Sequence, residues 1–556
     1  MSRPFARAFA MLAVLACRPA LADDWIALDR CAGGPGAEPH VDVLESTDGC
    51  FRAEVRFPGF WRGIDERDGR AWDRLRLPGG GGAREVGRPD LPEFRVRVAL
   101  PRGTAGVASI AGREEVELGG RFLPWPAQDD TGIEDGPVPA FQLDPAAYRS
   151  PVAYPARAIE TEALGRRRGH DVLAIRIAPL SWVASTRTLR ALHSIEVRVD
   201  FRPAPAPARP GVPPGRLGAV LVRGLLNPDL LHERLAEGRP GDRNAGCDYL
   251  IVTHPDLRDA ARRLAAGARA RGLTARIATT DETGPTAAAI ESYVDASMSW
   301  RNPPSYLCLL GDVELVPTVY RTEHPTGRFD DGQRKWIGSD HAYACVDGPA
   351  DFEADLLCGR LPAGDLAEAT AMIQKLEDQL DRPVDPAALE RVLLASYFQD
   401  ADGDGREDRA YVQSAEAIGG DWSALGKQIH RVYEAPRRSE PRRFFDGRPL
   451  PADLRPAAGF DWNGDARRIE RAIEAGTFLV VHRDHGSHGG WIHPSYRVAD
   501  VERLTNATLP VVLSINCSTG WFDTETCQAQ YPPARRGDSF AETLLALPGS
   551  GAVAVV

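Results

Sequence analysis

Two apolar runs in the second half of the chain decide the fold. Residues 478–487 read FLVVHRDHGS, and residues 510–520 read PVVLSINCSTG. Each begins with a short apolar run that is typical of a buried strand in a parallel sheet, and then passes directly into polar and small residues. Because the active sites of open parallel sheets collect at the carboxyl ends of the strands, the residues that follow these two runs are candidate functional residues.

The sequence around these runs repeats the same pattern. From residue 248 onward, apolar strands alternate with amphipathic helices. Besides the two runs, we expect strands at 249–252, 274–279, 306–310, 392–395 and 552–556, and helices at 255–271, 287–298, 466–475 and 539–547. Such alternation predicts a parallel sheet that is covered by helices on both faces. We therefore expect two α/β subdomains, over residues 248–390 and 391–556.

The first half of the chain has a different pattern. Within residues 23–201, stretches such as 94–100 and 195–201 alternate apolar and polar residues, which is typical of half-buried strands. A β-rich domain is therefore predicted here. The Pro-rich sequence RPAPAPARPGVPPG, at 202–215, cannot donate sheet hydrogen bonds. We interpret residues 202–247 as a linker and processing region.

Length and composition narrow the class of protein. A chain of 556 residues exceeds the size at which a single core stops growing, so several domains are expected. Hydrophobic residues at 43% and charged residues at 26% are ordinary for a globular protein. The formal net charge of -11 disfavours binding to the phosphates of nucleic acid, so nucleic acid is not an expected partner.

The N-terminus has the pattern of an export signal. Two arginines precede the apolar run 8–16, and residues 20–22 offer small residues at a cleavage site. We therefore predict a signal peptide over residues 1–22 and a secreted product, extracellular or at the cell surface. A lipid anchor at Cys17 is the alternative, because the residues before it loosely resemble a lipobox. The apolar run is shorter than the ~20 residues that span a bilayer, so no transmembrane segment is expected.

The two apolar runs of the second half end in side chains that can form a catalytic pair. His485 and Gly486 follow the first run, and Cys517 follows the second. If the strands are neighbours, the imidazole can withdraw the thiol proton and later protonate the leaving amine. The backbone N–H groups of Gly486 and Cys517 are candidates to hold the developing oxyanion. A buried structural thiol is the alternative for an isolated cysteine, and Cys527 is a second candidate thiol, although it follows no apolar run.

This arrangement resembles the gingipain family of cysteine peptidases, relatives of caspases and legumains. The resemblance rests on the strand before His485 and Gly486 and on the strand before Cys517, and it covers roughly residues 248–556. It also includes shorter motifs at 309–312, 338–340 and 359–360, and more weakly at 87–92 and 99–101. The resemblance implies a caspase-like parallel sheet flanked by helices, preceded by a β-rich propeptide that inhibits the enzyme.

The resemblance also implies further site residues. Asp355, an acid shortly before a Gly-Arg pair, would orient His485, although the family usually has Glu there. Asp365 and Glu368 are candidates for the pocket acid with which the best-known members select Arg or Lys. Because gingipain-like domains continue beyond the strand in which this sequence ends, we expect the chain to be C-terminally truncated.

These expectations together predict a secreted cysteine endopeptidase made as a zymogen. It would hydrolyse peptide bonds of protein or peptide substrates through a Cys-His dyad and a thioacyl intermediate, without a cofactor for catalysis. Three alternatives stay open: a sortase-like transpeptidase of the same fold, an inactive secretion or surface component, and a zinc-dependent hydrolase. The zinc alternative rests on the histidines that crowd one loop, His482, His485, His488 and His493.

An acidic loop predicts a separate metal site. Asp400, Asp402, Asp404 and Asp408 place oxygen ligands around a glycine, as calcium loops do. The position at which an EF-hand carries a bidentate Glu is Tyr411. We therefore predict a structural Ca²⁺ site that is not an EF-hand, with a solvated acidic loop as the alternative.

Overall fold

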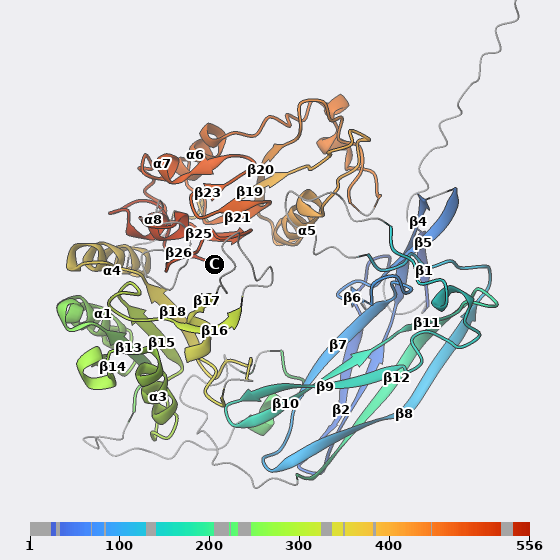
Figure 1. Ribbon diagram of the computed structural model, residues 1–556, viewed down its shortest axis with the longest axis horizontal. Helices are drawn as coiled ribbons and strands as arrows, with labels where there is room; N and C mark the ends of the chain where they lie inside the picture. The colour runs from blue at the N-terminus through green and yellow to red at the C-terminus, as the bar shows by residue number, and fades with distance from the viewer. Residues whose placement is uncertain are drawn as a thin grey trace, which may run out of the picture.

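A computed structural model describes most of the chain as one β-rich domain and two α/β units (Figure 1). The described residues are 24–28, 34–67, 69–82, 85–128, 141–204, 222, 224–231, 246–323, 336–348, 351–381, 385–445, 447–523 and 537–556. The predicted signal peptide, Cys17, Cys527 and most of the predicted linker lie outside them. In the part of the chain that is described, no helix is both long and apolar enough to cross a membrane.

The β-rich domain contains three sheets. Their strand orders are β1-β4-β5, β6-β7-β10-β9 and β11-β12-β3-β2, and β8 pairs with β12. The strands are β1 (Asp24–Ala27), β2 (His40–Ser46), β3 (Cys50–Arg56), β4 (Gly59–Arg67), β5 (Arg70–Arg76), β6 (Gly81–Gly82), β7 (Pro92–Ala99), β8 (Thr104–Leu118), β9 (Ile159–Arg167), β10 (His170–Ile177), β11 (Leu180–Val183) and β12 (Thr188–Pro203).

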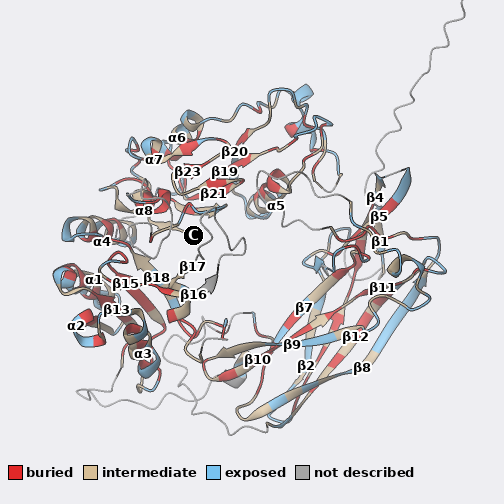
Figure 2. Cartoon of the chain, viewed as in Figure 1, coloured by how far each residue is buried: buried red, intermediate tan, exposed pale blue. Residues whose placement is uncertain are grey.

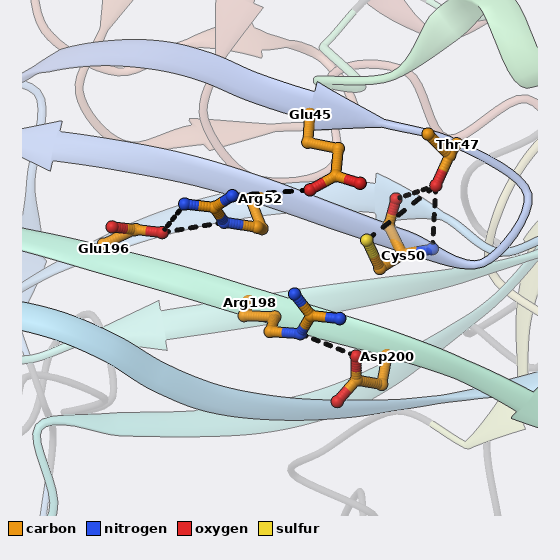
Figure 3. A network of polar contacts seen from close by, with 7 residues as sticks. All are labelled: Glu45, Thr47, Cys50, Arg52, Glu196, Arg198 and Asp200. Atoms are coloured by element: carbon orange, nitrogen blue, oxygen red, sulfur yellow. Dashed lines mark hydrogen bonds and ion pairs between the residues drawn. The ribbon is translucent and has the colours of Figure 1, made fainter.

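The core of this domain confirms the period-two pattern. Alternate residues of β7, Val96 and Val98, pack in one buried cluster with Ile195, Val197 and Val199 of β12. Glu196 and Arg198 lie between the apolar residues of β12, and Figure 3 shows their ion pairs with Arg52 and Asp200. The guanidinium of Arg52 on β3 donates to Glu196 on β12, with Nε 2.8 Å from Oε1. Each of these strands therefore has one apolar and one polar face.

The first α/β unit has a parallel sheet of order β14-β13-β15-β18. Its elements are β13 (Tyr249–Thr253), α1 (Arg258–Ala270), β14 (Ala275–Thr279), α2 (Thr280–Thr283), α3 (Ala287–Ser297), β15 (Tyr306–Leu310), β18 (Leu357–Leu361) and α4 (Leu366–Asp381). An antiparallel hairpin, β16 (Val319–Glu323) and β17 (Trp336–Ser339), lies between β15 and β18 in sequence.

The second α/β unit has a parallel sheet of order β20-β19-β21-β25-β26. Its elements are β19 (Arg391–Tyr397), α5 (Tyr411–Ala424), β20 (Gln428–Glu434), α6 (Ala466–Glu474), β21 (Leu479–Arg483), β22 (Gly486–Ser487), β23 (Gly490–Trp491), β24 (Tyr496–Arg497), α7 (Val498–Val501), β25 (Val511–Ile515), α8 (Phe540–Ala546) and β26 (Ala554–Val555). The predicted α/β class with parallel sheets is confirmed.

The central strands of the second unit are buried on both faces. Val480 belongs to the cluster that contains residues of α6, α7 and α8, whereas its neighbours Leu479 and Val481 pack in the cluster that contains residues of α5. Figure 2 shows the same distribution, with buried residues along the strands and exposed residues on the outer sides of the helices. Burial on both faces explains why these strands are continuous apolar runs in the sequence.

Candidate active site

His485 and Cys517 follow neighbouring strands. β21 and β25 pair in parallel, with Arg483 opposite Ile515, and each candidate residue comes two positions after this pair. The segments that follow the strands also touch, because a Cβ atom on Gly486 would lie 2.3 Å from Oδ1 of Asn516 and 2.7 Å from the carbonyl oxygen of Cys517. Glycine is therefore required where the histidine loop meets the cysteine loop.

Cys517 is the most accessible thiol among the described cysteines. Its side chain is exposed, Cys358 is partly buried, and the remaining four described cysteines, Cys50, Cys247, Cys308 and Cys345, are buried. Burial raises the pKa of the Cys308 thiol to about 11 and that of Cys247 to about 12, and it also raises the pKa of Cys358. Since the thiolate is the nucleophile, burial suppresses the reactivity of these three cysteines.

The His485 imidazole is held by two side chains that the sequence did not single out as its partners. Its Nε2 lies 3.0 Å from Oε1 of Gln399, and the hydroxyl of Tyr411 lies 3.4 Å from Nε2 and 3.5 Å from Nδ1. The two rings meet edge to face, with centroids 5.2 Å apart. Because an amide oxygen only accepts hydrogen bonds, this contact places the proton on Nε2. Nδ1 then remains as the basic nitrogen that can take the proton of a thiol.

A buried polar network supports the cysteine loop. Nδ2 of Asn516 donates to Nδ1 of His482 over 2.8 Å, and Nε2 of His482 lies 3.2 Å from the carbonyl oxygen of His493. The His482 ring also stacks on Trp491, with centroids 4.3 Å apart. Burial lowers the pKa of His482 to about 3, so this imidazole stays neutral and Nε2 carries its proton. Asn516, the residue before Cys517, therefore links the cysteine loop to β21, the strand that precedes His485.

Three of the four histidines that crowd this segment have separate partners. His482 contacts Asn516, His485 contacts Gln399, and His493 pairs with Glu434, whose Oε1 lies 3.2 Å from Nδ1. The two groups of three metal-ligating side chains found among the described residues consist of aspartates and include no histidine. The crowding of histidines in the sequence therefore does not correspond to a shared metal position in the described structure.

The structure places Asp355 away from His485. Its carboxylate accepts a hydrogen bond from the backbone N–H of Arg168, in the β-rich domain, and a longer one of 3.5 Å from that of Val346. Burial raises its pKa to about 8. Asp355 precedes β18 and so lies at the amino edge of the first sheet, whereas His485 follows β21 in the second sheet. Gln399, and not Asp355, is the residue placed against the imidazole.

Asp365 and Glu368, the two predicted pocket acids, bind backbone N–H groups near the start of α4. Oδ1 of Asp365 accepts hydrogen bonds from the backbone N–H groups of Ala367 and Glu368, at the start of α4. Oε2 of Glu368 accepts one from the N–H of Gly364 over 2.8 Å. Both carboxylates therefore satisfy backbone donors at a helix N-terminus, as capping residues do.

The acidic loop gathers three of its four predicted ligands. Carboxylate oxygens of Asp400, Asp402 and Asp404 lie within 4.8 Å of one another. Asp400 is buried and also accepts hydrogen bonds from the N–H groups of Asp404, at 3.1 Å, and Gly405, at 3.2 Å. Asp408 is outside this group, and its Oδ2 accepts a hydrogen bond from Ala401 N. Three converging carboxylates suit a hard cation such as Ca²⁺.

Two short motifs of the first α/β unit, at 338–340 and 359–360, contact the segment that follows Cys517. Both carboxylate oxygens of Asp340 accept hydrogen bonds from Arg360, at 2.7 and 2.8 Å. The Arg360 guanidinium also donates to the carbonyl oxygen of Gly311 and lies over the ring of Phe522, 5.3 Å from its centroid. Phe522 lies shortly after Cys517 in the chain. These motif residues therefore stabilise the contact between the two units.

Three residues of the site were missed in the sequence: Gln399, Tyr411 and Asn516. Gln399 follows β19 as His485 follows β21, so the rule that polar residues after parallel strands are functional candidates would have found it. In the sequence, Tyr411 only marks the position at which an EF-hand would carry a bidentate Glu. Asn516 was seen only as the residue before the cysteine, and the pattern held no sign of its contact with His482.

Several known proteins are similar to this chain. The model of peptidase family C25 matches residues 242–556. Lys-gingipain HG66 of Porphyromonas gingivalis is 22% identical over 512 residues, which cover 88% of this chain and 26% of that protein. Lys-gingipain W83 of the same organism is 24% identical over 348 residues, or 59% of this chain and 19% of that protein. The chain spans about a quarter of the length of the curated relatives it matches.

Solved structures of gingipains are also similar to this chain. The crystal structure of the Arg-specific cysteine proteinase gingipain R superposes with a TM-score of 0.42 and 18% identity, over 57% of this chain and 64% of that one. A structure concerned with the zymogenic latency of gingipain K from Porphyromonas gingivalis matches with a TM-score of 0.28 and 21% identity, over 33% of this chain and 99% of that one.

Proposed function

The chain belongs to peptidase family C25, and on this premise we propose that it is an exported cysteine endopeptidase made as a zymogen. The observation that supports the proposal is that an exposed thiol, Cys517, and an imidazole, His485, each follow one of two paired parallel strands by two residues. The gingipain resemblance predicted from the motifs agrees with the family match and with the Lys-gingipain relatives.

The proposed reaction uses this pair for acyl transfer. Nδ1 of His485 takes the proton of Cys517, and the sulfur attacks the carbonyl carbon of the scissile peptide bond. The imidazolium then protonates the leaving amine as the C–N bond breaks, which leaves a thioester on Cys517. Water, deprotonated by His485, hydrolyses the thioester and regenerates the thiol. Gln399 keeps Nε2 protonated and the ring oriented through this cycle.

The oxyanion is the second requirement of the reaction. We assign its stabilisation to the backbone N–H groups of Gly486 and Cys517. The support is that Gly486 lies against the Asn516 and Cys517 backbone so closely that a side chain there would clash. Two preorganised N–H donors at such a position are worth roughly 10²–10³ in rate each in other acyl-transfer enzymes.

The β-rich domain is the proposed inhibitor. It contacts both α/β units: Arg167 forms an ion pair with Glu353 of the first, and Asp65 accepts two hydrogen bonds of 2.9 Å from Arg406 of the second. A similar solved structure is a complex between the pro- and mature domains of RgpB from Porphyromonas gingivalis. Removal of this domain would activate the enzyme.

The acidic loop is the proposed calcium site. Asp400, Asp402 and Asp404 would bind Ca²⁺ through carboxylate oxygens. The two residues in contact with His485 flank this loop, because Gln399 precedes it and Tyr411 begins the helix after it. The ion would therefore order the segment that orients the catalytic base, without taking part in the reaction.

Activity on peptides tests the proposal. After removal of the β-rich domain, the protein should hydrolyse members of a mixed-sequence fluorogenic peptide library, and Cys517→Ala should abolish this. His485→Ala should lower kcat by about 10³-fold or more. Hydrolysis that survives Cys517→Ala but stops when a zinc chelator is added would refute the cysteine mechanism.

A further inference from the structure

A turn of the β-rich domain inserts an arginine into the first α/β unit. Arg168, between β9 and β10, is 2% exposed and has a left-handed backbone, with φ at 53°. Its Nη2 donates to the carbonyl oxygen of Pro304 at 2.9 Å and to Oγ of Ser305 at 3.1 Å. Nη1 faces Sδ of Met298 at 3.8 Å, and Nε is buried without a hydrogen-bond partner among the described residues. Burying a guanidinium is costly unless its donors are satisfied, so the two bonds of Nη2 are the polar contacts that hold this side chain in place.

The backbone of the same turn is also bound. The N–H of Arg168 donates to Asp355, and the N–H of Arg166 donates to Oδ1 of Asp351 over 3.1 Å. Gly165 approaches the same carboxylate so closely that a Cβ atom would lie 2.3 Å from Oδ1 of Asp351. Its φ of 128° also favours glycine. The fit therefore extends over the whole turn.

Charge complementarity adds to this fit. The turn carries three consecutive arginines, and it faces a cluster of carboxylates on the first α/β unit. Arg166 pairs with Asp347 at 3.5 Å, and Arg167 pairs with Glu353. Burial lowers the pKa of Arg168 to about 10, which leaves its guanidinium protonated at neutral pH.

This contact is remote from the proposed catalytic pair. Pro304 and Ser305 precede β15, and Asp355 precedes β18, so the arginine turn sits at the amino edge of the first sheet. His485 and Cys517 lie at the carboxyl edge of the second sheet. The second contact with the peptidase region, between Asp65 and Arg406, involves a guanidinium that is 27% exposed and is expected to be weaker.

The segment after the β-rich domain stays with that domain. Oδ1 of Asn227 accepts a hydrogen bond from Ala99 N, and its Nδ2 donates to Ala99 O, both over 2.8 Å. Val222 and Leu225 pack against Ala99 of β7 and Val172 of β10. A cut in residues 232–245 would therefore leave the arginine turn attached to an intact β-rich domain.

We infer that the Arg168 turn is the main attachment of the β-rich domain, and that it holds this domain on the peptidase region after the connecting chain is cut. Rupture of this contact, and not cleavage alone, would then release the inhibitor. The inference rests on the proposed zymogen function. Because attachment of the β-rich domain is measured without peptidase activity, a failure of this inference can be distinguished from a failure of the proposed function.

The test uses the whole chain carrying Cys517→Ala and a site-specific protease sequence inserted in residues 232–245. After cutting, the two fragments should co-elute in size-exclusion chromatography, and dilution followed by native mass spectrometry gives their dissociation constant. Arg168→Asn removes the guanidinium and tolerates the left-handed backbone. It should raise the dissociation constant by about 30-fold or more, as expected when one partner of a buried charged contact is lost.

Arg187→Asn is the matched control. Arg187 is an exposed arginine of the same domain with nearly the same backbone, φ 56°, and its substitution should change the constant by less than about 2-fold. Asp355→Ala, which removes the acceptor of the Arg168 N–H, tests the contact from the other side, and it is the deciding variant if uncut Arg168→Asn has a lowered melting temperature. The inference would be overturned if the wild-type fragments separate at micromolar concentration. It would also be overturned if both variants have the same dissociation constant as the wild type.

Discussion

Oε1 of Gln399 lies 3.0 Å from Nε2 of His485, so an amide contacts the proposed catalytic base. The amide oxygen accepts the Nε2 proton and leaves Nδ1 as the basic nitrogen. Unlike an acid, it adds no negative charge beside the imidazolium that forms during the reaction. The contact therefore orients the ring more than it stabilises its charge.

Removing this amide should slow the chemical step. We expect Gln399→Ala to lower kcat by roughly 10- to 100-fold with little change in KM, because the ring loses its orientation while the substrate contacts remain. Gln399→Glu retains the acceptor and should keep most of the activity. Steady-state kinetics on one peptide substrate measures both, with Gln428→Ala on the edge strand β20 as the control. An unchanged kcat in Gln399→Ala would refute the orienting role.

Calcium should stabilise the protein through the acidic loop. At an ion concentration about 100 times the dissociation constant, binding adds about 2.7 kcal/mol to the free energy of unfolding, which corresponds to a rise of roughly 5 °C in Tm. Differential scanning calorimetry with added Ca²⁺ or with EGTA measures this difference. Asp402→Asn combined with Asp404→Asn should remove it, whereas Asp421→Asn on the exposed side of α5 should not. A Tm that is the same with Ca²⁺ and EGTA would exclude the site.

Acid should destabilise the fold through His482. Burial lowers the pKa of its imidazole from 6.5 to about 3, so the neutral form is preferred in the folded state. This contribution is fully present above pH 6.5, and it is lost as the pH falls toward 3, because the unfolded chain then binds one more proton. Over this window the free energy of unfolding should fall by about 1.4 kcal/mol per pH unit from this residue.

Urea unfolding followed by far-UV circular dichroism measures this effect. His482→Gln lacks the titrating group and does not lose this contribution in acid. The free energy by which the wild type exceeds the variant should therefore shrink steadily as the pH falls below 6.5. His40→Gln, at an exposed residue of the β-rich domain, is the control and should follow the wild type. A difference that stays constant across these pH values would show that His482 does not titrate in this way.

The sequence predicted the strands of the site because their composition is set by burial on both faces. Val480 and Val512 could only be placed in a parallel sheet, and the residues after them followed from that placement. Helix α5 was missed since Gly419 and Gly420 weaken its helical pattern. Strand β18 was missed because Arg360 interrupts its apolar residues, and the structure buries this arginine against Asp340.

The orienting residue could not be found from linear spacing. Asp355 was chosen by its distance from a motif, but it precedes its strand, and residues before a parallel strand lie at the opposite edge from those after one. Its carboxylate is instead bound by the Arg168 turn, which comes from a domain nearly two hundred residues earlier in the chain. No local pattern in the sequence records such a contact.

The most direct test of the central claim is covalent labelling of the protein, freed of its β-rich domain, by a library of peptidyl acyloxymethyl ketones, followed by peptide mapping in a mass spectrometer. The account predicts a single adduct on Cys517 that is absent in Cys517→Ala, strongly slowed in His485→Ala and unaffected by Cys358→Ala. An adduct on another cysteine, or labelling of Cys517 at the same rate without His485, would contradict it.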